Sequence, residues 1–457
     1  MDVALMIHNR SDEPSIQYSI YYPHDIDYFT QYGNTIVFSP SLKKWCKVND
    51  IVHEFIKLVT QDKRGSITYN QIRKLIENSS DISMDSSHIH RFCKSIIKTG
   101  VFYQSEEAMC NAESRAFEKK HIPKDTILNT AYIHPTHRCN FNCSYCYNAS
   151  LERSQNTELS TEQWCIALDQ LRKIGVERVI FTGGEPFLRD DLAELLAYSN
   201  NLGNYTEVLT NGSLLTNDLI DEFSNYINRI IISLDSLDQS TQSKNRSSLG
   251  FETILDSISY LSESNGPKVS VRSVITRNNV SEIESLKESL ETDYNVEHLS
   301  TIFLPNSLDE VDLMPADEFY SDDDKDYHHE IDGRKYIPGI IRCGACTQIV
   351  ALDAHGDVFP CQNFIKYRNY RVCNIFENDW YNTLLNSELR ERFRMLSVLE
   401  KEVCKECNLS FICGGGCPAI SCHVYGNLNS HLPFLCDHLK EFSKERMILA
   451  ARKIIPV

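Results

Sequence analysis

The middle of the chain alternates between two hydrophobic patterns. Short apolar runs rich in β-branched residues predict buried strands, and longer stretches with apolar residues at helical spacing predict helices. The expected strands are 129–134, 177–182, 205–210, 229–234, 268–275 and 298–304. The expected helices are 160–174, 190–202, 217–225, 251–264 and 280–292. Repeated strand–helix units predict a parallel α/β sheet with functional loops at its C-terminal edge. Six strands are too few to close an eight-stranded barrel, so we expect an open, partial (β/α)6 barrel.

The region before this core has a different pattern. Its expected elements are strands at 34–39 and 43–49, helices after Asp50, near 68–78 and after Ser86, and a strand at 101–103. Two strands, three short helices and a final strand predict a winged-helix-like unit. Residues 1–30 show no clear periodicity, and the charged stretch 105–125 predicts a linker.

Charge and length narrow the class of protein. A chain of 457 residues predicts two or three domains. The net charge of −17 argues against nucleic acid as the main partner. The first twenty residues lack an apolar signal sequence, and no apolar run is long enough to span a membrane, so we expect a cytoplasmic protein. The acidic stretch 307–340 resembles a calcium loop only faintly, since Tyr327 stands where such a loop needs Gly, and a solvated insertion is the expectation.

The cysteines are too numerous and too clustered for ordinary packing. There are 17 of them, and clustered thiols in a cytosolic chain suggest metal. The first group, Cys139, Cys143 and Cys146, follows directly after the first strand of the core. Three thiolates on one loop can bind three irons of a [4Fe–4S] cluster and leave the fourth iron open. Zinc is the alternative, with His137 as a fourth ligand.

A second motif ends the next strand of the core. Gly183, Gly184, Glu185 and Pro186 form a turn in which glycines let a backbone approach a ligand closely. The Glu185 carboxylate can accept from an ammonium group. Alone, this motif is also consistent with a plain Gly-Gly turn, but its place one strand–helix unit after the cysteines favours a binding site.

Together the two motifs resemble the radical S-adenosylmethionine (SAM) superfamily over roughly 128–305. The resemblance implies that a reduced cluster held by the three cysteines cleaves SAM to methionine and a 5′-deoxyadenosyl radical. It implies that Tyr145 lies beside the adenine and that Gly183, Gly184 and Glu185 hold the methionine amino group. Ser233 looks like the family's ribose-binding serine and Arg246 like its carboxylate-binding arginine, although a surface Arg246 at a helix terminus is the alternative.

The third signal lies near the C-terminus. Cysteines recur there in a fixed order: Cys343, Cys346, Cys361, Cys404, Cys407, Cys413, Cys417 and Cys436, with Gly356 five positions before Cys361. A zinc ribbon explains only the Cys404–Cys407 pair. The order is similar to the SPASM extension, which implies two auxiliary [4Fe–4S] clusters and therefore three clusters in all. The resemblance assigns the first auxiliary cluster to Cys343, Cys346, Cys361 and Cys417, and the second to Cys404, Cys407, Cys413 and Cys436. If only one of Cys343 and Cys346 binds, an open iron is available to a substrate thiolate.

Residues 31–106 resemble the peptide-recognition element fused to maturases of ribosomally made peptides, in which a leader peptide adds as an extra strand. A purely structural or a DNA-binding winged helix is the alternative. The expected organisation is 1–30 N-terminal segment, 31–106 recognition element, 107–127 linker, 128–306 radical SAM core, 307–340 acidic bridge, 341–440 SPASM domain and 441–457 C-terminal helix.

These resemblances imply an enzyme that matures a ribosomal precursor peptide by a thioether crosslink. Reduced flavodoxin or ferredoxin is the expected electron donor, and neither nucleic acid nor membrane is an expected partner. A maturase that forms carbon–carbon links or modifies a folded protein is one alternative, and a non-catalytic iron–sulfur electron carrier is another. The carrier leaves the Gly-Gly-Glu motif unexplained.

Overall fold

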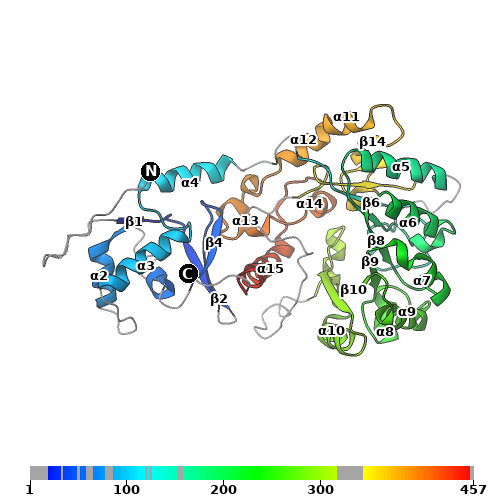
Figure 1. Ribbon diagram of the computed structural model, residues 1–457, viewed down its shortest axis with the longest axis horizontal. Helices are drawn as coiled ribbons and strands as arrows, with labels where there is room; N and C mark the ends of the chain where they lie inside the picture. The colour runs from blue at the N-terminus through cyan, green and yellow to red at the C-terminus, as the bar shows by residue number, and fades with distance from the viewer. Residues whose placement is uncertain are drawn as a thin grey trace. The chain divides into compact units, whose positions relative to one another are not determined.

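The chain divides into two compact units that are described separately (Figure 1). The computed structural model describes residues 19–31, 34–48, 52–57, 65–77, 86–118, 122, 126–151, 158–315 and 343–452. The smaller unit comprises 1–119, 336–340 and 443–457, and the larger comprises 120–335 and 341–442. Most of the expected acidic bridge and the first eighteen residues lie outside the described residues.

The larger unit is built on one mostly parallel sheet, and all six expected core strands are present in it. They are β6 (Thr130–Ile133), β7 (Arg178–Phe181), β8 (Tyr205–Thr210), β9 (Arg229–Ser233), β10 (Lys268–Ile275) and β11 (Glu297–Ile302). Each pairs in parallel with the next along the chain. The sheet does not end at β6, because β12 (Ile349–Leu352) from the cysteine-rich region adds a further parallel strand beside it. An antiparallel β13 (Asp357–Phe359) and β14 (Cys373–Asn374) complete the sheet.

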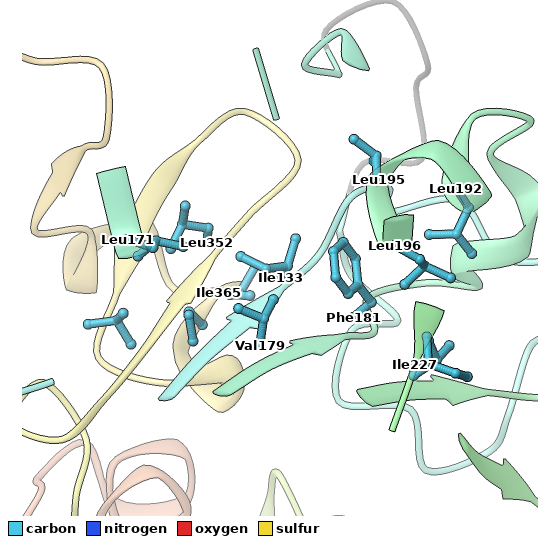
Figure 2. Close-up of a cluster of buried hydrophobic side chains, with 14 of the residues drawn as sticks. Ile133, Leu171, Val179, Phe181, Leu192, Leu195, Leu196, Ile227, Leu352 and Ile365 are labelled. Atoms are coloured by element: carbon cyan, nitrogen blue, oxygen red, sulfur yellow. The ribbon is translucent and has the colours of Figure 1, made fainter. Parts of the chain in front are cut away.

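Helices between the strands cover one face of this sheet. They are α5 (Thr161–Lys173), α6 (Leu192–Asn201), α7 (Asn217–Phe223), α9 (Phe251–Glu263) and α10 (Ile283–Thr292), close to their expected places, and a short α8 (Gln239–Asn245) that was not expected. Successive strand residues point to opposite faces, so alternate residues face the helices. Figure 2 shows this core, with Phe181 of β7 beside Leu196 of α6. The core fixes the strand ends that carry the two motifs.

The cysteine-rich part continues from β14 into short helices. They are α11 (Trp380–Leu385), α12 (Glu388–Met395), α13 (Ser410–Cys413) and α14 (Pro418–Tyr425). The closing helix α15 (Pro433–Arg452) begins earlier than the sequence pattern suggested. Among the described residues, no helix is both long enough and apolar enough to span a bilayer.

The smaller unit holds two small sheets and several helices. Its elements are β1 (Ser19–Tyr21), β2 (Asp27–Gln31), β3 (Asn34–Ser39), β4 (Lys44–Val48), β5 (Ser66–Thr68), α2 (Tyr69–Glu77), α3 (Ser86–Lys98) and α4 (Glu106–Glu118), with a helical segment at 52–57. The strands β2, β3 and β4 form an antiparallel sheet, and β1 pairs with β5.

Two sequence expectations for this unit were wrong, and a third stretch had given none. The stretch 1–30 contributes β1 and most of β2, whose short runs are too brief to show a period. The expected linker contains helix α4, which buries Met109 despite its charged composition. The expected strand at 101–103 is reduced to a single bridge between Tyr103 and Tyr21.

Candidate functional site

The loop that carries the cysteine triplet is hydrogen-bonded to the Gly-Gly-Glu turn. The backbone N–H of Gly184 donates to the Thr136 carbonyl at 3.0 Å, and that of Glu185 donates to the Arg138 carbonyl at 2.7 Å. A Cβ on Gly184 would lie 1.9 Å from the Arg138 carbonyl oxygen. Only glycine therefore allows the two loops to approach this closely, and the motif's second glycine positions the cysteine loop.

The Glu185 side chain is buried and holds the end of the next strand. Its carboxylate accepts from Thr210 Oγ1 at 2.7 Å, from the Asn211 backbone N–H at 2.8 Å and from the Phe187 backbone N–H at 3.2 Å. Burial raises the pKa of Glu185 to about 7 against the opposing effect of these hydrogen bonds. Both carboxylate oxygens thus already have donors from the chain itself. The expected role of Glu185 toward the SAM ammonium group stays a prediction.

Three residues form a buried charged unit beside the triplet. Arg246 Nε lies 3.0 Å from Asp235 Oδ1, and the Arg246 guanidinium lies 5.3 Å from the centre of the Tyr145 ring. The Tyr145 hydroxyl donates to Asp235. Burial alone would lower the pKa of Arg246, but the Asp235 carboxylate outweighs it and raises that pKa. Arg246 is therefore not a surface residue. Sequence reasoning missed Asp235, although it follows Ser233 by two positions.

The Arg246 guanidinium also faces the cysteine loop. Burial raises the pKa of Cys143 to about 11, and the positive charge of Arg246 opposes that rise. The backbone N–H of Ser144 donates to the Asn245 carbonyl at 2.9 Å, which ties the end of α8 to the loop. Ser233 ends β9 and pairs in register with Arg272 of β10. The structure thus places four of the expected SAM-site elements at the C-terminal edge of the sheet: the triplet, the glycine turn, Tyr145 with Arg246, and Ser233.

The cysteines form three groups in which each thiol affects its neighbours electrostatically. After burial, Cys146 and Cys139 raise the pKa of Cys143. Burial raises the pKa of Cys361, and Cys343, Cys417 and Cys346 add to that effect. Burial raises the pKa of Cys404, and Cys413, Cys436 and Cys407 add to it although Lys401 opposes them. Such mutual effects require proximity, so the structure brings together the same three sets that the sequence order indicated.

The donor sets fit iron–sulfur clusters, whose iron atoms are held by cysteine thiolates. Among the described residues, no three His, Cys, Asp or Glu side chains are close enough to hold a single metal ion. A four-iron cluster spreads its thiolate ligands farther apart than a single ion does, so this finding does not bear on cluster binding.

Cys346 is placed differently from the other thiols of its group. It is fully buried, and its backbone has a φ of +59°, the left-handed region that non-glycine residues rarely occupy. Burial raises its pKa to about 12, and its charged or thiol neighbours are Arg390, Cys373 and Cys343. Cys343, by contrast, has Cys417 as its thiol neighbour.

Two further residues near the triplet carried no sequence signal. Lys366 Nζ donates to Asn306 Oδ1 at 3.0 Å and lies near the negative charge of Cys146. Burial lowers the pKa of Lys366. His134 is fully buried at the end of β6, where burial and then His137 lower its pKa to about 3. Neither residue lies in a recognisable motif, so only the fold brings them to the site.

Two regions of the chain match known protein families. Residues 133–290 match the radical SAM superfamily, and residues 343–408 match the SPASM iron–sulfur cluster-binding domain. An uncharacterized protein of Archaeoglobus fulgidus is 25% identical over 71% of this chain and 82% of its own length. The PqqA peptide cyclase of Bradyrhizobium diazoefficiens is 43% identical, but over 20% of this chain and 23% of its own. The Fe-coproporphyrin III synthase of Methanosarcina barkeri is 33% identical over 34% and 39%. The matches to these two named relatives thus span well under half of their length.

Solved structures share the fold. SuiB of Streptococcus suis bound to S-adenosylmethionine superposes with a TM-score of 0.55 at 16% identity, over 91% of this chain and 99% of that one. SuiB bound to its precursor peptide SuiA gives 0.53 at 17% identity, over 90% and 98%. The enzyme anSMEcpe with AdoMet and a bound peptide gives 0.59 at 20% identity, over 71% and 99%.

The class of protein follows from these matches and from the grouping of the thiols. It is an enzyme of the radical SAM type, with a SAM-binding core and an iron–sulfur-binding SPASM domain.

Proposed function

We propose that this enzyme matures a ribosomally synthesised peptide by joining a substrate cysteine sulfur to a carbon of another residue. The observation that carries the proposal is the coexistence, in one unit, of the SAM-type cysteine loop and two auxiliary thiol groups. The similarity to a peptide cyclase and to SuiB, which was solved with a precursor peptide, supports a peptide as substrate.

Three [4Fe–4S] clusters would be held by the three thiol groups. Cys139, Cys143 and Cys146 would hold the SAM cluster, and Cys404, Cys407, Cys413 and Cys436 the second auxiliary cluster. Cys343, Cys361 and Cys417 would hold the first auxiliary cluster, whose fourth iron is either bound by Cys346 or left open. When bound and reduced, the SAM cluster supplies the electron that cleaves SAM to a 5′-deoxyadenosyl radical. Reduced flavodoxin or ferredoxin would deliver that electron, in the cytoplasm.

The chain's own residues would orient SAM at the C-terminal edge of an open barrel. The backbone carbonyls of Gly183 and Gly184, together with Glu185, would accept from the methionine ammonium group. Tyr145 would lie against the adenine and Ser233 would contact the ribose. Because Arg246 is ion-paired with buried Asp235, any bond it makes to the SAM carboxylate comes from a guanidinium already fixed in place.

The smaller unit would bind the leader of the precursor. Its antiparallel sheet has two edge strands, β2 and β4, and no described strand pairs with the outer edge of either. An edge strand offers unpaired backbone groups that an extended peptide can join. This assignment makes 31–106 a recognition element in place of a structural winged helix.

A thioether balances as a two-electron oxidation. The carbon loses a hydrogen atom, the cysteine loses its thiol proton, the carbon–sulfur bond forms, and one electron remains for an acceptor. The auxiliary thiol groups lie in the same unit as the SAM site and would hold that acceptor. A carbon–carbon link has the same electron balance, so the structure supports it as a second candidate.

Mass spectrometry of the modified precursor tests the proposal. The reconstituted enzyme is incubated without oxygen with SAM, reductant and a short cysteine-containing peptide, to be sought among the products of the neighbouring genes. A thioether removes two hydrogens per crosslink and protects that cysteine from alkylation. Loss of two hydrogens while every cysteine still alkylates would replace the thioether with a carbon–carbon or carbon–oxygen link. A protein that forms no 5′-deoxyadenosine at all would instead be an electron carrier.

A further inference from the structure

The sheet face opposite the helices is lined with charged side chains. On the strands, Val179, Val208, Ile230 and Val271 lie in the core that the helices complete. Strand residues alternate between faces, so their neighbours along the chain share the other face. We call this surface the polar face, and define it by Tyr132, Arg178, Glu207, Arg229, Ser270, Arg272 and Glu297.

Two of the three arginines on the polar face have carboxylate partners. Arg178 Nε lies 2.6 Å from Glu207 Oε1. Arg229 Nη2 lies 2.6 Å from Glu297 Oε2, and it also donates to Ser270 Oγ at 2.9 Å. These four charges therefore cancel within the chain.

Arg272 is the exception. No hydrogen bond or ion pair joins its side chain to another described residue, and its Nε is buried without a hydrogen-bond partner. Burial, and then the like charges of Arg229 and Arg178, act to lower the pKa of Arg272, while Tyr132 and Glu207 act to raise it. An arginine remains protonated through such a shift. A largely buried guanidinium without a counter-charge is unfavourable unless an anion joins it.

Tyr132 of β6 is a second donor on the polar face, although β7, β8 and β9 lie between its strand and the β10 strand of Arg272. The positive charge of Arg272 has the largest electrostatic effect of any neighbouring group on Tyr132. Burial raises the pKa of Tyr132, so its hydroxyl keeps its proton and can donate. No hydrogen bond joins that hydroxyl to another described residue. A guanidinium alone can bind both oxygens of a carboxylate, and a phenol hydroxyl elsewhere on the same face can add a further donor.

We propose that Arg272, on the polar face that it shares with Tyr132, binds a carboxylate of the substrate peptide, either an Asp or Glu side chain or a free C-terminus. The inference rests on the proposed function above, and it adds that the modified segment is acidic at this point. SAM is a poorer source of the carboxylate. The groups that act on Arg272 all lie on the polar face, whereas the cysteine loop is faced by Arg246.

Three blocked tripeptides test the inference on the reconstituted holoenzyme in the presence of SAM. Acetyl-Gly-Asp-Gly-amide carries a side-chain carboxylate, acetyl-Gly-Asn-Gly-amide carries none, and acetyl-Gly-Asn-Gly with a free C-terminus carries a terminal one. A charge-assisted hydrogen-bonded contact corresponds to about a tenfold difference in affinity. We expect the wild-type enzyme to bind at least one carboxylate peptide about tenfold more tightly than the neutral one, as measured by saturation-transfer NMR titration. The peptide that is preferred identifies the source.

Two variants separate the site from general charge. Arg272→Met should abolish the preference, whereas Lys268→Met should keep it, because Lys268 is an exposed cation on the same strand. Equal binding of the three peptides by the wild type, or a preference that survives in Arg272→Met, would overturn the inference.

SAM affinity is measured in parallel by equilibrium dialysis. A tenfold loss of SAM affinity in Arg272→Met that is absent for decarboxylated SAM would assign the residue to the SAM carboxylate and also overturn the inference. Failure of the proposed function shows separately, as a wild-type enzyme that forms no 5′-deoxyadenosine.

Discussion

Arg246 and Asp235 form a buried ion pair, with Nε 3.0 Å from Oδ1. The Asp235 side chain is completely buried and its other oxygen accepts from Tyr145. The pair joins the end of α8 to the end of β9 and faces the cysteine loop, so it fixes the orientation of two residues expected at the SAM site.

Asp235→Asn should destabilise the protein, because it leaves Arg246 buried without its counter-charge. Removing one partner of such a pair destabilises by about 3–5 kcal/mol. Urea unfolding without oxygen measures the change in the free energy of unfolding. The matched control is Glu377→Gln, which breaks the more exposed ion pair with Arg371 and should change stability by less than about 1 kcal/mol. Equal effects of the two substitutions would show that the buried pair has no special role.

Gly184→Ala should disrupt the cysteine loop through a backbone clash. The added Cβ would lie 1.9 Å from the Arg138 carbonyl oxygen, and a backbone atom cannot rotate away. We expect SAM affinity to fall by at least about tenfold, which corresponds to 1.4 kcal/mol. Gly426→Ala is the control, since nothing lies within 4 Å of the Gly426 Cβ position, although its φ of +69°, unlike that of Gly184, adds local backbone strain. A Gly184→Ala enzyme that binds SAM normally would contradict the proposed role of the turn.

Joint replacement of Cys139, Cys143 and Cys146 by Ala should abolish SAM cleavage and spare the auxiliary sites. The wild-type protein is expected to hold about twelve irons per chain after anaerobic reconstitution, and the triple variant about eight. Iron analysis and assay of 5′-deoxyadenosine measure the two effects. A wild-type protein that holds only about four irons would contradict the prediction of two auxiliary clusters. Continued SAM cleavage by the triple variant would show that these three cysteines do not hold the SAM cluster.

Deletion of residues 1–106 should weaken binding of the precursor leader while SAM cleavage survives. The residues expected at the SAM site all lie in the larger unit, whereas the edge strands β2 and β4 lie in the smaller one. Fluorescence anisotropy of a labelled leader peptide measures affinity, and 5′-deoxyadenosine formation without peptide reports on the remaining enzyme. Unchanged affinity for the leader peptide would show that residues 1–106 do not bind the leader.

Sequence pattern was most informative where local chemistry dictates structure. The β-branched patterns of β8 and β10 predicted those strands residue for residue, although Glu207 and Arg272 stand within them, because alternate residues of each strand are mostly apolar or β-branched. The Cys and Gly motifs could be read because iron–sulfur ligation and close backbone approach each demand one residue type. β12 was missed because its four residues pair with β6 from more than two hundred positions away. Asp235 and Lys366 were missed for the same reason, because their partners come from other strands or loops. Arg272 was missed because only the fold shows that its Nε is buried without a partner.

The sequence leaves open which of Cys343 and Cys346 is a ligand of the first auxiliary cluster, since either can begin the motif. Cys343 is an electrostatic neighbour of Cys417 and Cys361, two of the other expected ligands. Cys346 contributes least among the thiols that act on Cys361, and it has Arg390 and Cys373 as neighbours. Its backbone N–H donates to the carbonyls of Ile349 and Pro360, both at 2.9 Å, which holds it against the start of β12.

We therefore expect Cys343→Ala to cost the protein its first auxiliary cluster and Cys346→Ala to retain it. Cys343→Ala should lower the iron content from about twelve to about eight per chain, and Cys346→Ala should leave it near twelve. Iron analysis and Mössbauer spectra of each variant measure the difference, with Cys373→Ala as a control for loss of a buried thiol. If Cys346→Ala loses four irons as well, both thiols are ligands and the cluster has no open iron. If it keeps all twelve, the first auxiliary cluster has a vacant coordination position, where a substrate thiolate can bind on its way to a thioether.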